Sequence, residues 1–272
     1  MAEERQDACY KQAAKNNWSK NPCGSRNIKT RNFDNLTFED FAQLDKARYT
    51  YEYWMQEEFD NLDLKDKRVL EIGYGMGSDH LQLAMRGGTC YGIDLTPENL
   101  PICQKHLELN GFSSKLCIGD ATELPYEDNF FDVIYTFGVI HHIPKMEKVI
   151  NEIYRVLKPG GIVWCGVYNK NSWFYRCILL PDFVFSGDFK RMNLKQRLSL
   201  IEYPHKNKNI LVTLTTKREL RKLFYKYKVL DIKNRSISRD YFKVNGKHIL
   251  NEEEVAFLGS KFGWYNIVIA QK

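Results

Sequence analysis

The hydrophobic and polar positions between residues 69 and 168 alternate between short apolar runs and longer amphipathic segments. The apolar runs predict buried strands, because a strand covered on both faces has few polar positions. The predicted strands are residues 69–72, 90–93, 116–118, 131–137 and 162–168. Between them, apolar residues recur at helical spacing. This alternation predicts an α/β fold with a doubly wound, Rossmann-like sheet and helices on both faces.

Two helix starts are recognisable outside this region. Residues 37–59 have apolar residues at helical spacing, and Thr37 stands at the N-cap with an acidic residue three positions later. Thr216 begins a second capping box before another amphipathic segment. Residues 229–232 and 264–270 then predict a sixth and a seventh strand.

The remaining segments lack a periodic pattern. The first 35 residues are polar, but they include aromatic and proline residues that a disordered tail normally lacks, so we expect this arm to fold over the active site. The predicted organisation has four parts. These are an N-terminal arm with helices over residues 1–60, a ligand-binding core over 61–168, an insertion that forms a substrate cap over 169–215, and the C-terminal part of the sheet over 216–272.

A glycine-rich turn follows the first predicted strand, with glycine at positions 73, 75 and 77. Glycine accepts a positive φ and has no Cβ, so this turn allows a ligand to lie against the backbone. Asp94 ends the second predicted strand, about 20 positions later, where a carboxylate accepts hydrogen bonds from ribose hydroxyls. The dinucleotide fingerprint has glycine where this chain has Ser78. The turn therefore predicts a nucleoside ligand, either NAD or a nucleoside with an amino-acid tail.

Composition adds little to this interpretation. The 272 residues include 43% hydrophobic and 27% charged residues, which are ordinary values for a globular protein. The formal net charge of +6 is compatible with a Lys-rich solvated surface or with an anionic substrate.

The sequence also bears on location and metal content. The first residues are acidic and no apolar segment follows them, which argues against a secretory signal, and the apolar run 177–185 is too short to span a bilayer. The seven cysteines are scattered and never form a C-x-x-C pair. We therefore expect a cytoplasmic protein without a disulfide framework, a zinc site or another metal site.

Four motifs together resemble those of the class I S-adenosylmethionine-dependent methyltransferases. The similarity is close from about residue 69 to 168 and loose in the last helix and two strands. The motifs are Glu71-x-Gly73-x-Gly75-x-Gly77, Gly92-Ile93-Asp94, Gly119-Asp120-Ala121 with Leu124-Pro125, and Leu157-Lys158-Pro159-Gly160-Gly161. The patterns Trp18-x-x-Asn21-Pro22-Cys23-Gly24 and Tyr168-Asn169-x-x-Ser172 are also similar to a bacterial type 11, UbiE-like subgroup.

The resemblance implies a seven-stranded sheet with an antiparallel last strand, and S-adenosylmethionine as the cofactor, with S-adenosylhomocysteine as the product. It also implies residue roles. Asp94, with the neighbouring Leu95, would hold the ribose, and Asp120 and Ala121 would meet the adenine edge. Gly73, Gly75 and Gly77 would pass under the methionine part, Glu71 would orient that loop, and Phe137 and Gly138 would border the sulfonium side.

Methyl transfer from a sulfonium requires a base only when the acceptor must lose a proton. His141 and His142 follow the fourth predicted strand, where α/β sheets place their sites, and they are the candidate catalytic residues. A structural pair at a helix entry is the alternative. The tentative substrate pocket consists of Trp18, Cys23, Tyr49, Tyr168 and Asn169. Covalent catalysis by Cys23 is disfavoured, because its Pro-Cys pair precedes the whole fold.

Several acceptors remain open. Enzymes that methylate base amines usually have an Asn/Asp-Pro-Pro-Tyr/Phe turn after the fourth strand, whereas this chain has Thr136-Phe137-Gly138-Val139. A small-molecule acceptor, methylated on oxygen or nitrogen, is therefore favoured over RNA, a protein or a peptide. An NAD-dependent oxidoreductase and a catalytically silent cofactor-binding protein are more remote alternatives.

Overall fold

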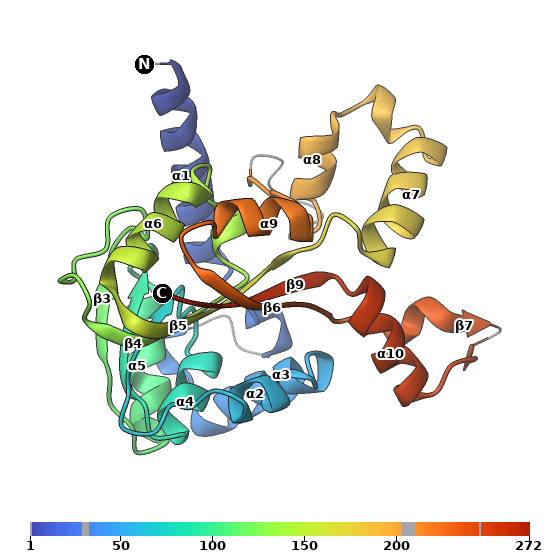
Figure 1. Ribbon diagram of the computed structural model, residues 1–272. Helices are drawn as coiled ribbons and strands as arrows, with labels where there is room; N and C mark the ends of the chain where they lie inside the picture. Colours follow the sequence, from blue (N-terminus) through green and yellow to red (C-terminus); the bar gives the residue numbers. More distant parts are fainter. Residues whose placement is uncertain (1, 29–32, 203–209, 245) are drawn as a thin grey trace.

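The computed structural model describes residues 2–28, 33–202, 210–244 and 246–272. Its centre is a seven-stranded sheet with the order β3-β2-β1-β4-β5-β9-β6 (Figure 1). The first five strands of the chain are parallel, and β9 runs antiparallel between β5 and β6. The strands are β1 (Arg68–Ile72), β2 (Thr89–Asp94), β3 (Lys115–Ile118), β4 (Phe131–Phe137), β5 (Leu157–Tyr168), β6 (Lys228–Arg235) and β9 (Tyr265–Gln271). The predicted fold class, including the antiparallel last strand, is confirmed.

Helices cover both faces of the sheet because alternate strand residues are apolar on each face. Leu70 and Ile72 of β1 pack into a cluster with α6, whereas Val69 packs on the opposite side with α3 and α4. Figure 1 shows α6 and α9 above the sheet and α3 and α4 below it. The helices of this core are α2 (Phe38–Tyr51), α3 (Met55–Asp60), α4 (Ser78–Met85), α5 (Asn99–Leu109), α6 (Met146–Val156), α9 (Lys217–Leu223) and α10 (Glu252–Phe262).

Both predicted capping boxes are present. The Thr37 side chain accepts a hydrogen bond from the Asp40 amide, and the Asp40 side chain accepts one from the Thr37 amide, which satisfies free donors at the start of α2. Thr216 and Glu219 make the same exchange at the start of α9.

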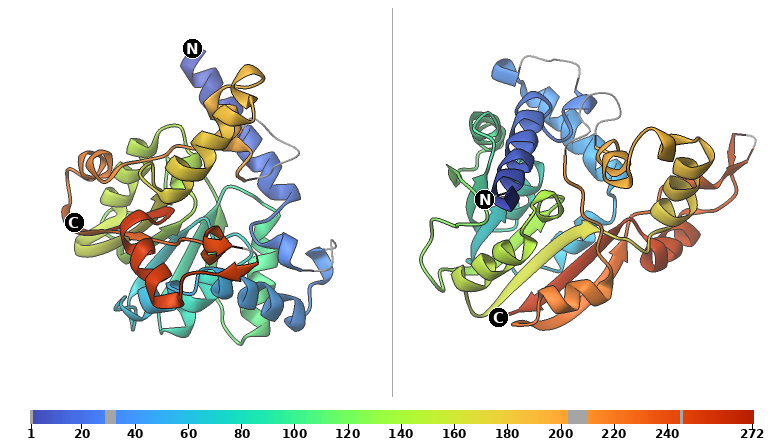
Figure 2. Two further views of the ribbon diagram at one scale, coloured as in Figure 1. Left: turned by 90° about the vertical axis from the view of Figure 1, so that its right-hand side faces the viewer. Right: turned by 90° about the horizontal axis from the view of Figure 1, so that it is seen from above.

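The N-terminal segment, for which the sequence shows no periodic pattern, is mainly helical. Residues Ala2–Lys20 form one helix, α1, followed by the short helices η1 (Ser25–Asn27) and η2 (Phe33–Asn35). The helix has almost no apolar stripe, so hydrophobic periodicity gave no sign of it. Asp7 of α1 pairs with Lys145 at the start of α6, at 2.9 Å, and α1 lies beside α6 (Figure 2).

Residues 170–202 form a separate projection (Figure 1). It contains η4 (Phe174–Leu179), α7 (Leu180–Phe185), η5 (Asp188–Lys190) and α8 (Leu194–Ser199). The two ends of the segment 169–215 meet, because Asn169 and Thr215 form an isolated bridge.

The start of strand β5 and two further elements differ from the sequence prediction. Strand β5 begins at Leu157 rather than at residue 162, since Leu157 already pairs with Phe131 of β4. The helix α10 and the hairpin of β7 (Lys243–Val244) and β8 (Lys247–His248) were not predicted.

Candidate active site

The glycine turn between β1 and α4 has the conformation that only glycine adopts readily. Gly73, Gly75 and Gly77 have φ values of +83°, +51° and +92°. A Cβ on Gly73 would collide with Val139, and one on Gly77 would lie 2.9 Å from the Cys103 sulfur. A Cβ on Gly75 would meet no atom within 4 Å. Close packing therefore explains the first and third glycines, whereas Gly75 leaves bare backbone facing open space.

Asp94 lies at the end of β2 and holds this turn in place. One carboxylate oxygen accepts the Gly75 N–H at 3.0 Å, and the other accepts the Thr96 N–H at 2.8 Å. Burial raises the pKa of Asp94, and these hydrogen bonds oppose that shift. The Asn99 and Thr96 side chains also donate hydrogen bonds to this carboxylate, which fix its orientation at the end of β2.

Asp120 follows β3 at the same edge of the sheet. Its Oδ1 accepts hydrogen bonds of 2.8 Å from the Thr122 amide and hydroxyl, and its Oδ2 forms an ion pair with Lys11 of α1. The neighbouring Ala121 is buried in the core between the sheet and α6. Asp120, which the family resemblance assigns to the adenine edge, therefore faces α1.

The other residues assigned to the cofactor lie around the same turn. Phe137, at the end of β4, packs its ring against Trp54 and Tyr265, and Gly138 has space for a Cβ at a φ of +76°. Leu95 is half-buried beside Asp94. Glu71 is buried and lies 2.8 Å from His80 Nδ1 in the helix after the turn.

His141 and His142 form the short helix η3 (Ile140–His142) beyond β4. The His141 side chain is fully buried, and neither ring nitrogen finds a hydrogen-bond partner among the described residues. Burial and the neighbouring His142 hold the pKa of His141 well below its usual value, so its imidazole is neutral. His142 Nδ1 lies 2.7 Å from the Leu211 carbonyl oxygen.

The tentative substrate residues have different surroundings. The Trp18 ring lies 5.8 Å from the His142 ring, and the Tyr168 ring lies 3.9 Å from the His141 ring. The Tyr168 hydroxyl donates a 2.6 Å hydrogen bond to Glu202. The structure thus brings Trp18 and Tyr168 to the two histidines.

Three further residues of that set have other contacts. Asn169 is buried and donates to the Gly263 carbonyl at 2.9 Å, which ties β5 to the start of β9. Tyr49 donates to the Ser78 carbonyl at 3.0 Å, at the first turn of α4. Cys23 is an exposed free thiol in the loop after α1, and it interacts electrostatically with Tyr168 and Glu202, so it too lies near the histidine pair.

Sequence reasoning missed three polar groups near these residues. Glu202 comes from the segment 169–215, which has no motif to mark it. Lys11 lies in a polar helix with many similar residues. The Asp79 carboxylate, at the start of α4, accepts hydrogen bonds from Arg48, Tyr49 and Tyr135. In the sequence, however, Asp79 resembles an ordinary acidic residue in the first turn of a helix.

Comparisons with known proteins agree with this geometry. Residues 70–165 match the family described as "Methyltransferase domain". A phthiotriol/phenolphthiotriol dimycocerosates methyltransferase of Mycobacterium leprae is 35% identical over 102 residues, which is 37% of this chain and 37% of that protein. The norajmaline N-methyltransferase of Rauvolfia serpentina is 37% identical over 106 residues, 38% of this chain and 36% of that protein. The chain thus spans little more than a third of these relatives.

Solved structures share the fold over more of the chain. A SAM-dependent methyltransferase from Methanosarcina mazei has a TM-score of 0.55 at 22% identity, and the match covers 79% of this chain and 96% of that one. Residues 70–165 therefore form a methyltransferase domain of the class I, S-adenosylmethionine-dependent type, and S-adenosylmethionine is the cofactor that this class implies.

The site fits this cofactor. The open backbone at Gly75 and Gly138 leaves room that a Cβ would fill, and the Asp94 carboxylate lies beside it, bonded to the Gly75 amide. Of the part of the chain described here, no helix is both long and apolar enough to cross a membrane.

Proposed function

We propose that the chain transfers a methyl group from S-adenosylmethionine to an oxygen or nitrogen atom of a small molecule. The observation that carries the proposal is the open Gly75 backbone held by Asp94 at the end of the adjacent strand, within a methyltransferase domain. Each of these features serves a nucleoside with an amino-acid tail, which needs a diol acceptor and a tight turn.

In this proposal the cofactor residues have separate tasks. Asp94 and Leu95 hold the ribose, and Asp120 and Ala121 meet the adenine, with the Asp120 carboxylate accepting from its amine. Gly73, Gly75 and Gly77 carry the methionine part, and Phe137 and Gly138 border the sulfonium. Glu71 positions the turn through its contact with His80, at 2.8 Å.

The cofactor supplies an activated methyl group on a sulfonium, so the protein has mainly to align the acceptor with it and to exclude water. We assign that alignment to the buried surface of Tyr168, Trp18 and the two histidines. For an acceptor that must lose a proton, His141 and His142 are our candidates to receive it. A neutral imidazole is the form that this role requires, and burial of His141 favours it.

The outer parts of the chain complete the proposal. We assign residues 1–60 to covering the site and residues 169–215 to capping the acceptor. The ion pair of Lys11 with Asp120 supports the first assignment, and the hydrogen bond of Tyr168 to Glu202 supports the second. The subgroup that the N-terminal Trp18-x-x-Asn21-Pro22-Cys23-Gly24 pattern resembles is part of the same proposal.

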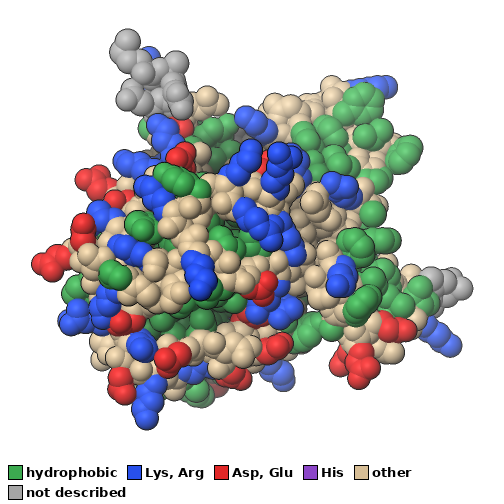
Figure 3. Space-filling view, viewed as in Figure 1, with side chains coloured by type: hydrophobic (Ala, Val, Ile, Leu, Met, Phe, Trp, Pro, Cys, Tyr) green, Lys and Arg blue, Asp and Glu red, His purple; other side chains and the backbone are tan. Residues whose placement is uncertain are grey.

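The charge distribution supports a small acceptor over a nucleic acid. Basic side chains gather over α9 in Figure 3, and of these Arg218, Arg221 and Lys222 are exposed on the outer face of a capped amphipathic helix. Exposure to solvent is sufficient to explain these basic side chains, without contact to the phosphate backbone of a nucleic acid. The seven free cysteines support a reducing, cytoplasmic location.

Calorimetry with the full chain tests the function. S-adenosylmethionine and S-adenosylhomocysteine should bind, and Asp94→Ala should abolish that binding. Asp63→Ala is the matched control, because the Asp63 side chain is 82% exposed and pairs with Lys67 on the surface. Binding of NADH in place of S-adenosylmethionine would overturn the proposal. Incubating cofactor and enzyme with metabolite, RNA and peptide pools, and searching each for a one-methyl mass shift, separates the acceptor classes.

A further inference from the structure

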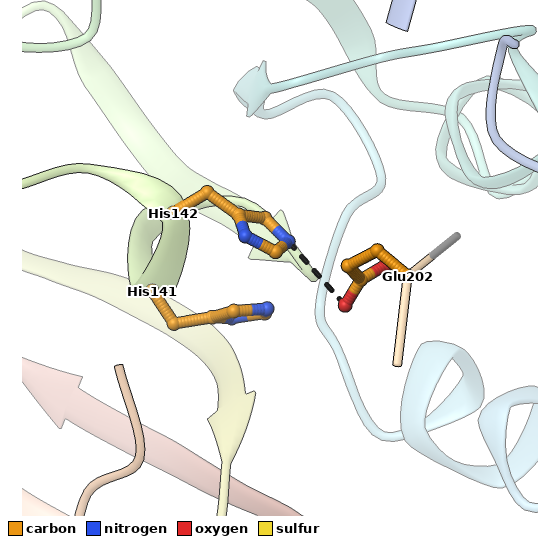
Figure 4. Close-up of side chains that lie close together, drawn as sticks. All are labelled: His141, His142 and Glu202. Atoms are coloured by element: carbon orange, nitrogen blue, oxygen red, sulfur yellow. Dashed lines mark ion pairs between the residues drawn. The ribbon is translucent and has the colours of Figure 1, made fainter. Parts of the chain in front are cut away.

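Three side chains converge beside the candidate acceptor site. His141 and His142 come from η3, and Glu202 comes from the end of the segment that contains α8. One ligand atom from each residue lies within 4.8 Å of the other two, and all three residues are buried. Figure 4 shows both imidazole rings pointing toward the Glu202 carboxylate.

The hydrogen bonds around this group fix which atoms present lone pairs. The Leu211 carbonyl can only accept, so His142 Nδ1 carries a proton, and Nε2 is the nitrogen that faces Glu202. This Nε2 lies 3.7 Å from a Glu202 oxygen, which is too far for a hydrogen bond. The same oxygen, Glu202 Oε1, accepts a hydrogen bond from the Tyr168 hydroxyl at 2.6 Å.

His141 adds an unexplained polar group to the same place. Its ring is fully buried, and neither nitrogen has a partner among the residues that the structure describes. Leaving such a group unpaired costs free energy, so buried polar atoms without partners indicate a missing ligand. Three lone-pair donors thus face one another, and what they lack is a cation.

We propose that His141, His142 and Glu202 bind one divalent transition-metal ion, with zinc as the first choice. Two imidazoles and one carboxylate are the protein ligands of a class of catalytic zinc sites that keep one position open. The 3.7 Å between His142 and Glu202 is close to the spacing of about 3.3 Å between two ligands of a tetrahedral zinc ion. Calcium and magnesium are disfavoured because they take mainly oxygen ligands.

The surroundings of the ligands support a built site. Histidines that bind metals usually donate their second ring N–H to a carbonyl or carboxylate, as His142 does to Leu211. Metal-binding carboxylates are themselves hydrogen-bonded, as Glu202 is by Tyr168. These partners orient the ligand lone pairs before any ion arrives.

The consequence for the reaction rests on the proposed function. The open coordination position would take the hydroxyl oxygen of the acceptor. Zinc lowers the pKa of a bound water to about 7, and by the same effect it would let the bound hydroxyl release its proton to solvent before the methyl group is transferred. The histidines would then hold the ion rather than receive the proton. This narrows the acceptor to a compound with a hydroxyl group.

Metal binding by the full chain is the test. After chelator treatment, titration with Zn²⁺ should give one site per chain with a Kd below about 1 μM. Co²⁺ should give the visible absorption of a tetrahedral site. Glu202→Gln and His142→Ala should each weaken Zn²⁺ binding by about 100-fold or more, and Tyr168→Phe by about 10-fold. His248→Ala is the control, because this surface histidine lies 3.8 Å from Asp240 and should leave the affinity unchanged.

The outcomes separate the two proposals. S-adenosylhomocysteine binding by each variant reports that the cofactor core is folded. Loss of metal with intact cofactor binding supports the site. Normal cofactor binding without any Zn²⁺ or Co²⁺ binding, or with binding that Glu202→Gln and His142→Ala leave unchanged, would overturn the metal site and leave the methyltransferase proposal standing. Binding of Zn²⁺ without binding of S-adenosylhomocysteine would support the metal site and overturn the methyltransferase proposal.

Discussion

Lys11 of α1 forms an ion pair with Asp120, a residue 109 positions later in the chain, at the end of β3. This contact joins the N-terminal helix to the edge of the sheet where we place the adenine. Partial burial opposes ionisation of Asp120, but Lys11 and the Thr122 hydrogen bonds outweigh it, and the pKa of Asp120 is lowered.

The sign of this shift predicts a pH dependence. Because the folded-state pKa of Asp120 lies below the unfolded value of about 3.9, its contribution to stability is complete above that value and disappears as the pH falls through the lowered folded-state pKa. We expect Asp120→Asn to reduce the free energy of unfolding by about 1 kcal/mol at neutral pH and by less at pH values near 3. Urea denaturation at both pH values measures this, with Asp63→Asn as the exposed control. An equal loss at both would contradict the assignment.

A pair of glycine substitutions can distinguish backbone strain from the loss of space for the cofactor. Gly75→Ala places a Cβ in the open space at a φ of +51°, so we expect a loss of about 1 kcal/mol in stability and of about 10-fold or more in S-adenosylhomocysteine affinity. Gly111→Ala is the matched control, with a φ of +78° and an equally open Cβ position in the loop after α5. It should cost the same stability and leave the affinity unchanged. Equal affinities in both variants would remove Gly75 from the site.

The ion pair of half-buried Arg48 with the buried Asp79 carboxylate predicts a large effect on stability. Asp79→Asn leaves the Arg48 charge without its partner, so we expect the free energy of unfolding to fall by about 3–5 kcal/mol. Asp60→Asn removes a similar partner from Arg86, but the Asp60 side chain is 68% exposed, and its loss should cost less than about 1 kcal/mol. Denaturation of the two variants side by side measures the difference, and comparable losses would contradict the role of burial.

We expect leucine substitutions at two fully buried histidines, His141 and His106, to change the stability of the protein in opposite directions. His141 has no hydrogen-bond partner among the described residues, whereas the His106 ring lies 2.9 Å from the Met76 carbonyl and 3.2 Å from Asp45. In metal-free protein, His141→Leu should raise the melting temperature, because it removes an unpaired polar group, and should lower methyl transfer by about 100-fold. His106→Leu should lower the melting temperature. A destabilised His141→Leu variant that retains turnover would refute both roles of His141.

The features of this fold that the sequence predicts are those that depend on contacts between residues close together in the chain or on a fixed spacing between elements. Thr37 and Thr216 start helices through contacts three residues away, so their capping boxes can be recognised from the sequence. Asp94 could be placed because the spacing of strand, turn and helix fixes its position relative to Gly75.

Residues that depend on distant contacts could not be placed in this way. Glu202 approaches the histidines only after a long aperiodic segment has folded, and Lys11 finds Asp120 across most of the domain. The expectation of no metal site rested on the cysteine pattern, and that pattern carries no information on a site made of two adjacent histidines and a remote glutamate.

The bridge between Asn169 and Thr215 has a consequence for how such chains diverge. Because the two ends of the intervening segment already touch, its length and sequence can change at little cost in loop-closure entropy, about 0.6 kcal/mol for each doubling of length. Relatives with the same sheet can therefore exchange this segment as a module. Glu202 lies in this segment, whereas His141 and His142 lie in η3, directly after β4. A relative that replaces the segment would therefore keep the two histidines and could lose the glutamate that we propose as the third metal ligand.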